Sequence, residues 1–466
     1  MSKDIIVKKG LNINLVGDAT KTLDISKNSK YYSVYPEDFH GVFPKLTIKV
    51  DEKVKAGDVL FYDKNNEEVK FVSPVSGKIT EIQRGERRRI VSIEILADKK
   101  IEYKNLGKLD KKADKNKIIK YLLNAGLWPF IKQRPYDVIA DHNVPPKSIF
   151  ISGFSSAPLS ADLDYISKGY QDKIQTAINL LSKLTEGEIH MSVRKNSNSE
   201  LSSLANVTIH NVSGPHPSGN VGTLINKVSP VNKGEVVWTI ALQDLILIGS
   251  VVESGKFSAE RIIALVGSSV ENPRYIKTLI GSGMSTILGK DIQDGNRIIS
   301  GNILTGKQIS IEGHLDYYSN TVSVIPEGND YDLFGWTRPI FDKISTSRAL
   351  TFSWLLPNKK YSLNTNTNGE HRAFVVTGSY EKVFPLDIYP MRILKACMYK
   401  DLGEMEVLGM YEVAPEDFAL TEFICVSKQP HQQIIRKGLD LMKKELGQIV
   451  LIIFKKVSIN YLKIKN

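Results

Sequence analysis

The first hundred residues consist of short alternating runs of apolar and polar residues, separated by glycine, proline and asparagine. Residues 57–60 predict a turn that leads into a short strand, and residues 71–72 predict the strand that returns. Between them, residues 63–66 predict a polar hairpin tip, because asparagine tolerates the left-handed backbone of tight hairpins. Residues 90–95 alternate as a half-buried strand does. This spacing indicates a small two-sheet sandwich, to which we assign residues 1–104.

The predicted sandwich resembles the barrel-sandwich folds of biotinyl and lipoyl carrier domains. In such carriers a lysine at the hairpin tip holds the cofactor. Here the tip falls on Asn65 and Asn66, with Lys64 one or two places away. We therefore interpret Lys64 as a solvated lysine, because charged side chains mostly stay at the surface.

The middle of the chain changes to a strand–helix–strand pattern. Residues 149–151 form an apolar run typical of a strand, and apolar residues then recur at helical spacing over 174–184, with Gly187 expected as the C-cap. Two further strand-like runs follow at 189–193 and 207–212. This order predicts a βαβ unit with a parallel sheet, which is Rossmann-like but lacks a glycine-rich dinucleotide fingerprint.

Short strands return after residue 257, and helices dominate beyond residue 385. The strands are expected at 261–266, 297–303 and 321–325. Pro390 marks a helix start, and Gly403 is expected just beyond the end of that helix.

The last predicted helix has one apolar face and is expected to end before Gly447. Its face carries Ile435, Leu439, Met442 and Leu446. We thus predict an α+β multidomain protein. Its domains are a barrel-sandwich (lipoyl-like) domain over 1–104, a Rossmann-like α/β domain over 105–256, a small β-domain over 257–330, and a mixed region over 331–466 that ends in C-terminal helices and a basic tail.

Charge and cysteine content narrow the classes of function. Lysine and arginine outnumber aspartate and glutamate by 62 to 51, a net charge of +11, and part of the excess lies in the turn 84–89 and the tail. A basic face suits an acidic partner or an anionic membrane surface. A nucleic-acid partner is not expected, because no basic patch is interleaved with stacking aromatic residues. Two cysteines exclude a disulfide scaffold and a self-contained four-cysteine iron–sulfur cluster.

No membrane-spanning run and no secretory leader are expected in this sequence. The opening residues lack the apolar core of a secretory signal. The apolar runs 245–252 and 449–454 are far shorter than the roughly 20 residues that cross a bilayer.

Several motifs resemble catalytic or binding signatures without meeting their requirements. Residues 301–308 match a phosphate-binding loop, but Gln308 stands where a serine or threonine should hold magnesium, and a strand pattern follows instead of a helix. We therefore interpret this segment as a turn. His216, in the turn 214–219, is expected to be exposed and structural. We find no catalytic, cofactor-binding or metal-ligating set, and Cys397 fits a small buried hydrophobe.

Two aromatic-rich stretches are candidates for binding a flat apolar ligand. They span residues 31–39 and 126–136. Quinones and similar ligands bind between aromatic and aliphatic walls with a few polar anchors. Packing beneath loops explains the same aromatic residues, and that alternative stays open. If a quinone contacts this chain, we expect the contacts at Tyr35, Phe39, Trp128 and Tyr136.

Taken in order, a series of unusual strings resembles the A subunit of the Na⁺-translocating NADH:quinone reductase (Na⁺-NQR), a bacterial respiratory pump. The resemblance extends from about residue 3 to residue 446. The strings are at 7–11, 71–77, 84–85, 126–128, 134–135, 184–187, 214–217, 272–274, 299–301, 304–306, 333–336, 365–369, 378–381 and 385–387.

The resemblance implies a peripheral subunit on the cytoplasmic face of the bacterial inner membrane. The whole complex oxidises NADH, reduces ubiquinone or menaquinone and exports Na⁺. The implied partners are the other subunits, especially the B subunit in the membrane, together with quinone and the membrane surface. Flavins and iron–sulfur centres are implied on those other subunits, so this chain is expected to hold no cofactor and not to be catalytic by itself.

The implied fold is similar to the flavin subunit of respiratory complex I, which makes the region 257–330 a soluble-ligand-binding β-domain. In that relative a glycine-rich loop holds flavin mononucleotide. The corresponding region here is 126–132, whose bulky residues would obstruct the flavin phosphate.

Alternatives remain for the whole chain and for its tail. A self-sufficient soluble flavoprotein would be yellow, and a lipoyl-like carrier would gain mass on a lysine. The tail 447–466 lies beyond the family pattern. Its apolar run followed by Lys455 and Lys456 fits contact with a membrane surface, and it equally fits an extension without a role.

Overall fold

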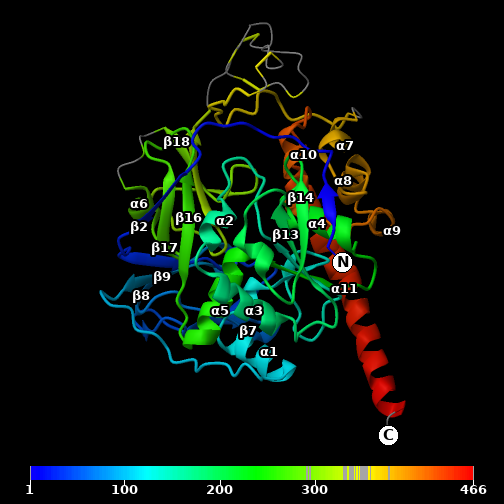
Figure 1. Ribbon diagram of the computed structural model, residues 1–466. Helices are drawn as coiled ribbons and strands as arrows, with labels where there is room; N and C mark the ends of the chain where they lie inside the picture. Colours follow the sequence, from blue (N-terminus) through cyan, green and yellow to red (C-terminus); the bar gives the residue numbers. More distant parts are fainter. Residues whose placement is uncertain are drawn as a thin grey trace.

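The computed structural model describes residues 2–289, 292, 295–328, 358–375 and 378–464, together with residues 333, 334, 341, 343, 344, 346, 355 and 356. For residues 448–464 it describes the backbone only. The described residues form four sheets and a group of C-terminal helices, which are arranged as in Figure 1. The multidomain α+β architecture predicted from the sequence is confirmed. The motif at 333–336, one of those that carry the family resemblance, lies only in part within the described residues, which include 333 and 334.

The barrel-sandwich domain consists of a four-stranded sheet facing a three-stranded sheet. The larger sheet has the order β3(Tyr31–Val34), β9(Ile90–Ala97), β8(Gly77–Arg84), β5(Lys53–Val54), and the smaller has the order β4(Pro44–Leu46), β6(Val59–Asp63), β7(Asn66–Val72). Strands β6 and β7 form the predicted hairpin, in which Asp63 pairs with Asn66. Lys64 lies exposed at its tip.

The first 25 residues contribute two strands to sheets outside the sandwich. β1(Asp4–Ile6) pairs in parallel with β14(Thr208–Ser213) of the α/β sheet. β2(Thr20–Ile25) pairs in parallel with β17(Arg274–Leu279). A short strand pattern shows which side chains share a face but not which sheet accepts the strand, so the boundary could not be read from periodicity.

The α/β domain is built on a seven-stranded, mostly parallel sheet. Its order is β1, β14, β13(Ile189–Arg194), β12(Ile149–Ser152), β15(Val237–Ala241), β10(Lys132–Arg134), β11(Val138–Ile139), in which β10 runs antiparallel to both β15 and β11. The predicted βαβ unit is present as β12, α3(Gln171–Leu181) and β13. Gly187 is not the C-cap, because α3 ends at Leu181 with Ser182 as its cap. A Cβ at Gly187 would lie 1.9 Å from the carbonyl oxygen of Lys147, so glycine is needed there for close approach.

Alternate side chains of the central strand enter two different cores. Ile149 and Ile151 pack in the larger core, with α3 and α5(Leu242–Ser254). Phe150 enters a second core, with α4(Val221–Val228) and the C-terminal helices. A strand buried on both faces is apolar throughout, which is why this run does not alternate in sequence.

The small β-domain contains a six-stranded sheet. Its order is β19(Lys307–Ile309), β18(Asn296–Ser300), β20(Thr321–Pro326), β16(Glu260–Val266), β17, β2, with α6(Met284–Leu288) beside it. The phosphate-loop look-alike connects antiparallel strands β18 and β19. Its interpretation as a turn is confirmed.

The C-terminal helices pack against the second core and along one side of the α/β sheet. They are α7(Ser379–Val383), α8(Pro390–Tyr399), α9(Leu402–Val407), η6(Pro415–Phe418), α10(Ala419–Phe423) and α11(His431–Ile464). Helix α8 begins at Pro390 as predicted but is capped by Lys400 in a left-handed conformation, and Gly403 lies inside α9. Helix α11 does not end at Gly447. It continues to Ile464 and projects beyond the rest of the molecule (Figure 1).

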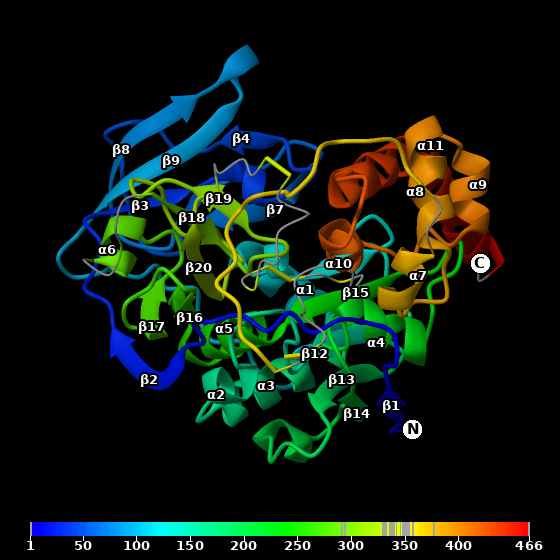
Figure 2. The same ribbon diagram turned by 90° about the horizontal axis from the view of Figure 1, so that it is seen from above.

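The three domains share one large hydrophobic core. Seen from above, β8 and β9 lie on one side of the molecule and α8 and α9 on the other (Figure 2). The remaining helices lie in the barrel-sandwich and α/β domains. They are α1(Lys115–Asn124), α2(Leu163–Ser167), η1(Pro36–Asp38), η2(Glu86–Arg88), η3(Trp128–Phe130) and η4(Glu200–Ser203). Among the described residues, none of the helices has the length and apolar character needed to cross a membrane.

Candidate functional site

The edge at which parallel α/β sheets commonly bind ligands is covered here by the chain itself. Strand order reverses between β12 and β15, and the turn 214–220 folds over the segment that follows β12. The Gly219 N–H donates to Ser156 Oγ (2.8 Å), and Ser152 Oγ donates to the Gly219 carbonyl (2.6 Å). The crevice outside the carboxyl ends of the strands, where such folds bind nucleotides, is therefore filled by protein.

His216 lies in this turn and is buried, with 3% of its surface exposed, so the expectation of an exposed side chain is wrong. Its Nδ1 lies 3.1 Å from Ser156 Oγ, and its backbone N–H donates to Asn12 Oδ1. Burial lowers the pKa of His216 to about 4, so the imidazole is neutral at pH 7. The N-terminal segment covers the turn, which no local pattern shows.

The segment 126–132 is also tightly packed, with residues 126–131 buried. Trp128 is fully buried, donates from Nε1 to the Ala140 carbonyl (2.7 Å) and meets Trp238 edge-on with ring centroids 5.4 Å apart. Gly126 has a φ of +68°, and a Cβ there would lie 2.5 Å from Val72. The loop is thus held against the barrel-sandwich domain, and these residues do not fit a cradle for a flavin phosphate.

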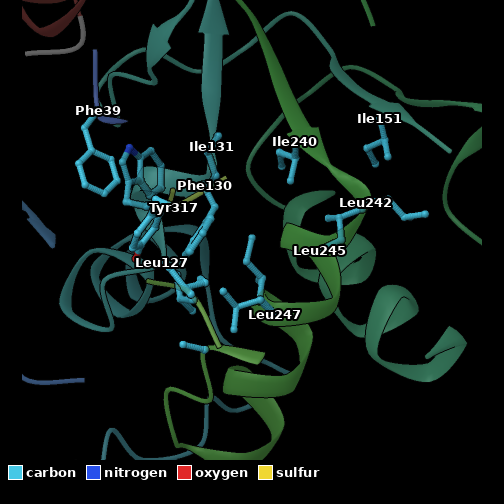
Figure 3. Packing of buried hydrophobic residues seen from close by; sticks show 14 of the residues in the cluster. Phe39, Leu127, Phe130, Ile131, Ile151, Ile240, Leu242, Leu245, Leu247 and Tyr317 are labelled. Carbon is cyan, nitrogen blue, oxygen red and sulfur yellow. The ribbon is translucent and has the colours of Figure 1, made fainter. Parts of the chain in front are cut away.

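Aromatic rings from all three domains meet beside this segment. Phe39, directly after η1, contacts Phe71 (4.3 Å between centroids) and Tyr317 (4.7 Å). Phe130 of η3 stacks on Tyr317 at 5.0 Å with an interplanar angle of 19°. Figure 3 shows Phe39, Phe130 and Tyr317 gathered at one end of the larger core. Tyr318 completes the group and is only half-buried. We call Phe39, Phe130, Tyr317 and Tyr318 the aromatic junction.

Half-buried polar groups border the aromatic junction. Lys132 Nζ lies 4.2 Å from the centre of the Tyr318 ring. Asp38 Oδ2 accepts a hydrogen bond from the Tyr317 N–H (3.1 Å). Asp316 is held by Ser300 Oγ (2.8 Å) and by neighbouring backbone N–H groups. We call Asp38, Lys132 and Asp316 the polar rim.

A buried ion pair holds the backbone of Tyr317 in the aromatic junction. Arg261 of β16 donates to Asp244 of α5 (2.6 Å) and to the Tyr317 carbonyl (3.0 Å). Both charged side chains are nearly inaccessible to solvent. Removing one partner of such a pair leaves a buried charge uncompensated, so the pair holds the α/β domain and the β-domain in one arrangement.

The structure brings only some of the predicted quinone-facing residues together. Tyr35 and Phe39 flank η1, and the Tyr35 hydroxyl lies 3.3 Å from His314 Nδ1. Trp128 is in the same core as Phe39, but its ring meets those of Trp238 and His142. Tyr136 lies in the second core, where its carbonyl accepts from Arg436.

Sequence reasoning missed Asp38, Lys132, Phe130, Tyr317 and Tyr318 as a group. The aromatic pair 317–318 next to Asp316 was the available signal, but nothing local connects it with residues about 280 positions earlier. Elsewhere, Cys397 is buried against Met410, as predicted. Among the described residues, no group of three or more histidine, cysteine, aspartate or glutamate side chains could hold a metal ion.

The fold and the site define a multidomain protein that joins a barrel-sandwich domain to an α/β domain through an aromatic junction. Family models match each part. They are the NqrA N-terminal barrel-sandwich hybrid domain over residues 5–98, the NqrA second alpha/beta domain over 113–257, and the NQRA C-terminal domain over 262–310.

Curated relatives match over almost the whole chain. The A subunit of the Na⁺-translocating NADH-quinone reductase from Neisseria gonorrhoeae is 36% identical over 95% of this chain and 100% of the relative. The Photorhabdus laumondii and Vibrio campbellii proteins of the same name are each 33% identical, again over 95% of this chain and 100% of the relative. The chain belongs to the NqrA family, the A subunits of the Na⁺-translocating NADH-quinone reductases.

A solved structure of an NAD⁺-reducing [NiFe]-hydrogenase also aligns with the fold. It is 11% identical, covers 66% of this chain and 56% of its own, and has a TM-score of 0.34. A likeness of that size carries no argument about function.

Proposed function

We propose that this chain is a peripheral, cofactor-free subunit of a Na⁺-pumping NADH:quinone reductase on the cytoplasmic face of the bacterial inner membrane. It docks on the membrane subunits, above all the B subunit, and contributes the aromatic junction to quinone binding. NADH, flavins and iron–sulfur centres belong to partner subunits, and the isolated chain does not catalyse the reaction.

The observation that carries the quinone role is the half-buried Tyr318 ring, which packs against the buried rings of Phe39, Phe130 and Tyr317. A quinone head group is flat and apolar with two carbonyl oxygens, so it suits an aromatic wall bordered by hydrogen-bond donors. Lys132 supplies such a donor beside the ring. Tyr35 supplies another, at the opposite end of η1 from Phe39.

The filled positions support a role without a bound cofactor. The turn 214–220 covers the carboxyl edge of the parallel sheet, and Trp128 and Phe130 fill the region where the flavin-binding relative has its glycine-rich loop. Exposed Arg87 and Arg88, near the end of the barrel-sandwich domain, offer cationic side chains for contact with an acidic partner or lipid surface.

The proposal is tested by measuring the affinity of the purified chain for a water-soluble quinone analogue. We expect Tyr35→Ala and Tyr318→Ala to weaken binding at least tenfold, equivalent to about 1.4 kcal/mol. Tyr136→Phe is the control. It keeps the ring in the second core and should leave the dissociation constant within about twofold.

Unchanged affinity in both alanine variants would exclude the aromatic junction as the quinone site. An absorbance spectrum and an intact mass of the same preparation test the cofactor part. Flavin absorbance would support the flavoprotein alternative, and an added mass on Lys64 would support the carrier alternative.

A further inference from the structure

We propose that Asp38 donates a proton to the quinone as it is reduced at the aromatic junction, and that Lys132 binds the quinone oxygen. This inference rests on the proposed function and adds the residues that carry its proton chemistry. It is drawn from the arrangement of the polar rim around Tyr318.

Asp38 is placed by its neighbours in the fold. It ends η1 immediately before Phe39, whose ring lies 5.8 Å from that of Tyr318, so its carboxyl group stands next to the aromatic wall. The Tyr317 N–H, 3.1 Å from Oδ2, fixes its position. Asp38 is half-buried, so part of the residue is open to solvent.

Lys132 lies over the face of the Tyr318 ring. It begins β10, is half-buried, and its ammonium lies 4.2 Å from the centre of the Tyr318 ring. Within the part of the chain that the structure describes, no carboxylate lies within ion-pair distance of Lys132. An ammonium in this position is available to donate to a carbonyl oxygen that gains negative charge.

Burial, assisted by one neighbouring carboxylate, keeps Asp38 protonated near neutrality. Burial and the facing carboxylate of Asp316 raise the pKa of Asp38 to about 8, against the lowering effects of the Tyr317 N–H and of Lys132. The other titratable groups that face it are the phenols of Tyr35 and Tyr318, whose pKa values are themselves raised by burial. At pH 7 the rim therefore holds a neutral carboxylic acid beside a cation. An acid whose pKa lies near the working pH is suited to proton transfer.

Reduction of a quinone to the quinol takes up two electrons, here from the partner subunits, and two protons. The O–H bond of the Asp38 carboxyl breaks and an O–H bond forms on one quinone oxygen, while the second oxygen takes its proton from solvent water. The carboxylate left on Asp38 is stabilised by the Tyr317 N–H and Lys132, and solvent water then restores its proton.

The test compares Asp38→Asn with Glu37→Gln in the assembled complex. Glu37 is the neighbouring acid, is exposed, and pairs with Arg89 (2.9 Å) and Lys307. We expect Asp38→Asn to lower kcat for quinone reduction at least tenfold at pH 7. KM and the dissociation constant of the analogue should stay within about twofold. The wild-type kcat should fall above about pH 8, and the variant should lack this fall. Glu37→Gln should follow the wild type, and Asp38→Glu should restore part of kcat.

Two failures can be told apart. If Asp38→Asn binds the analogue normally and keeps the wild-type kcat and pH profile, the proton-donor inference is overturned while the quinone site stands. If Tyr318→Ala leaves the binding of the analogue to the purified chain unchanged, the quinone site itself is wrong, and this inference falls with it. Lys132→Met should weaken analogue binding severalfold, and unchanged binding would remove Lys132 from the site.

Discussion

Buried histidines hold the N-terminal residues onto the α/β sheet. The Lys3 N–H donates to His210 Nδ1 (3.2 Å), so His210 carries its proton on Nε2 and donates to His190 Nδ1 (3.2 Å). Both imidazoles are buried. Desolvation lowers the pKa of His210 to about 4 and also lowers the pKa of His190. The arrangement requires neutral rings, since a protonated Nδ1 could not accept from Lys3.

The free energy of unfolding should therefore fall in mild acid. The unfolded chain binds a proton on His210 near pH 6.5, whereas the folded chain does so only near pH 4. Stability from this group is fully present above pH 6.5 and is lost as pH falls toward 4, by up to about 1.4 kcal/mol per pH unit.

Urea unfolding of wild type and His210→Gln at several pH values between about 7 and 4.5, which span most of this window, measures the effect. The variant should show a pH slope smaller by nearly one proton. Equal slopes for wild type and His210→Gln would contradict the prediction. Comparing the two proteins separates His210 from buried acids such as Asp38, whose raised pKa acts in the opposite direction.

At the level of elements, one glutamine connects a helix of the α/β domain to a strand of the β-domain. Gln243 of α5 donates from Nε2 to the Ile262 carbonyl (2.7 Å) and accepts from the Ile262 N–H (3.0 Å). Strand β16 pairs with β20 only from Ala264 onward, so the amide satisfies the backbone groups that the sheet leaves unpaired at Ile262. Gln243 is nearly fully buried.

Gln243→Ala should destabilise the protein by about 2–4 kcal/mol, because it leaves a buried N–H and a buried carbonyl without partners. Lys256→Ala, at an exposed residue just beyond α5, should stay within about 0.5 kcal/mol. Chemical denaturation monitored by tryptophan fluorescence compares the three proteins. A loss below about 0.5 kcal/mol in Gln243→Ala would show that water replaces the amide at the strand edge.

Element prediction succeeded where the pattern is local. The β6–β7 hairpin, the β12–α3–β13 unit and the start of α8 were found from periodicity and turn residues. Helix ends were less predictable. Gly187, Gly403 and Gly447 all resemble C-caps, yet the first serves close backbone approach and the other two lie within helices. A glycine marks where a side chain is disfavoured, and several tertiary reasons lead to the same residue.

At the scale of the whole molecule, α11 joins the parts of the fold. Its first half buries Ile435, Leu439 and Met442 in the second core. Arg436 pairs with Asp137 of the α/β domain (2.8 Å), and Asp440 pairs with His40 of the barrel-sandwich domain (2.6 Å). The helix thus contacts two domains and the C-terminal core at once.

Truncation at two positions should show how much each half of α11 contributes to stability. Ending the chain after Gly447 keeps every buried side chain that the structure describes on α11, so the melting temperature should change by no more than a few degrees. Ending it after Pro430 removes Ile435, Leu439 and Met442, and the loss of each should cost about 2–5 kcal/mol. Their summed cost is similar to the whole free energy of unfolding of a typical domain. Circular dichroism melting of both truncated proteins tests this, and a cooperative, near-wild-type melt of the shorter protein would contradict the role given to α11.

The sequence by itself determined the local features of this protein: the order of strands and helices, the hairpin tip at 63–66, the turn at 301–308 and the family. These follow from periodicity and backbone preference within a few residues. Only the tertiary structure decided that β1 and β2 join distant sheets, that His216 is buried, and that Asp38 and Lys132 lie beside the pair Tyr317 and Tyr318. Those contacts join residues hundreds of positions apart, and their free energy comes from packing between domains, which no local pattern encodes.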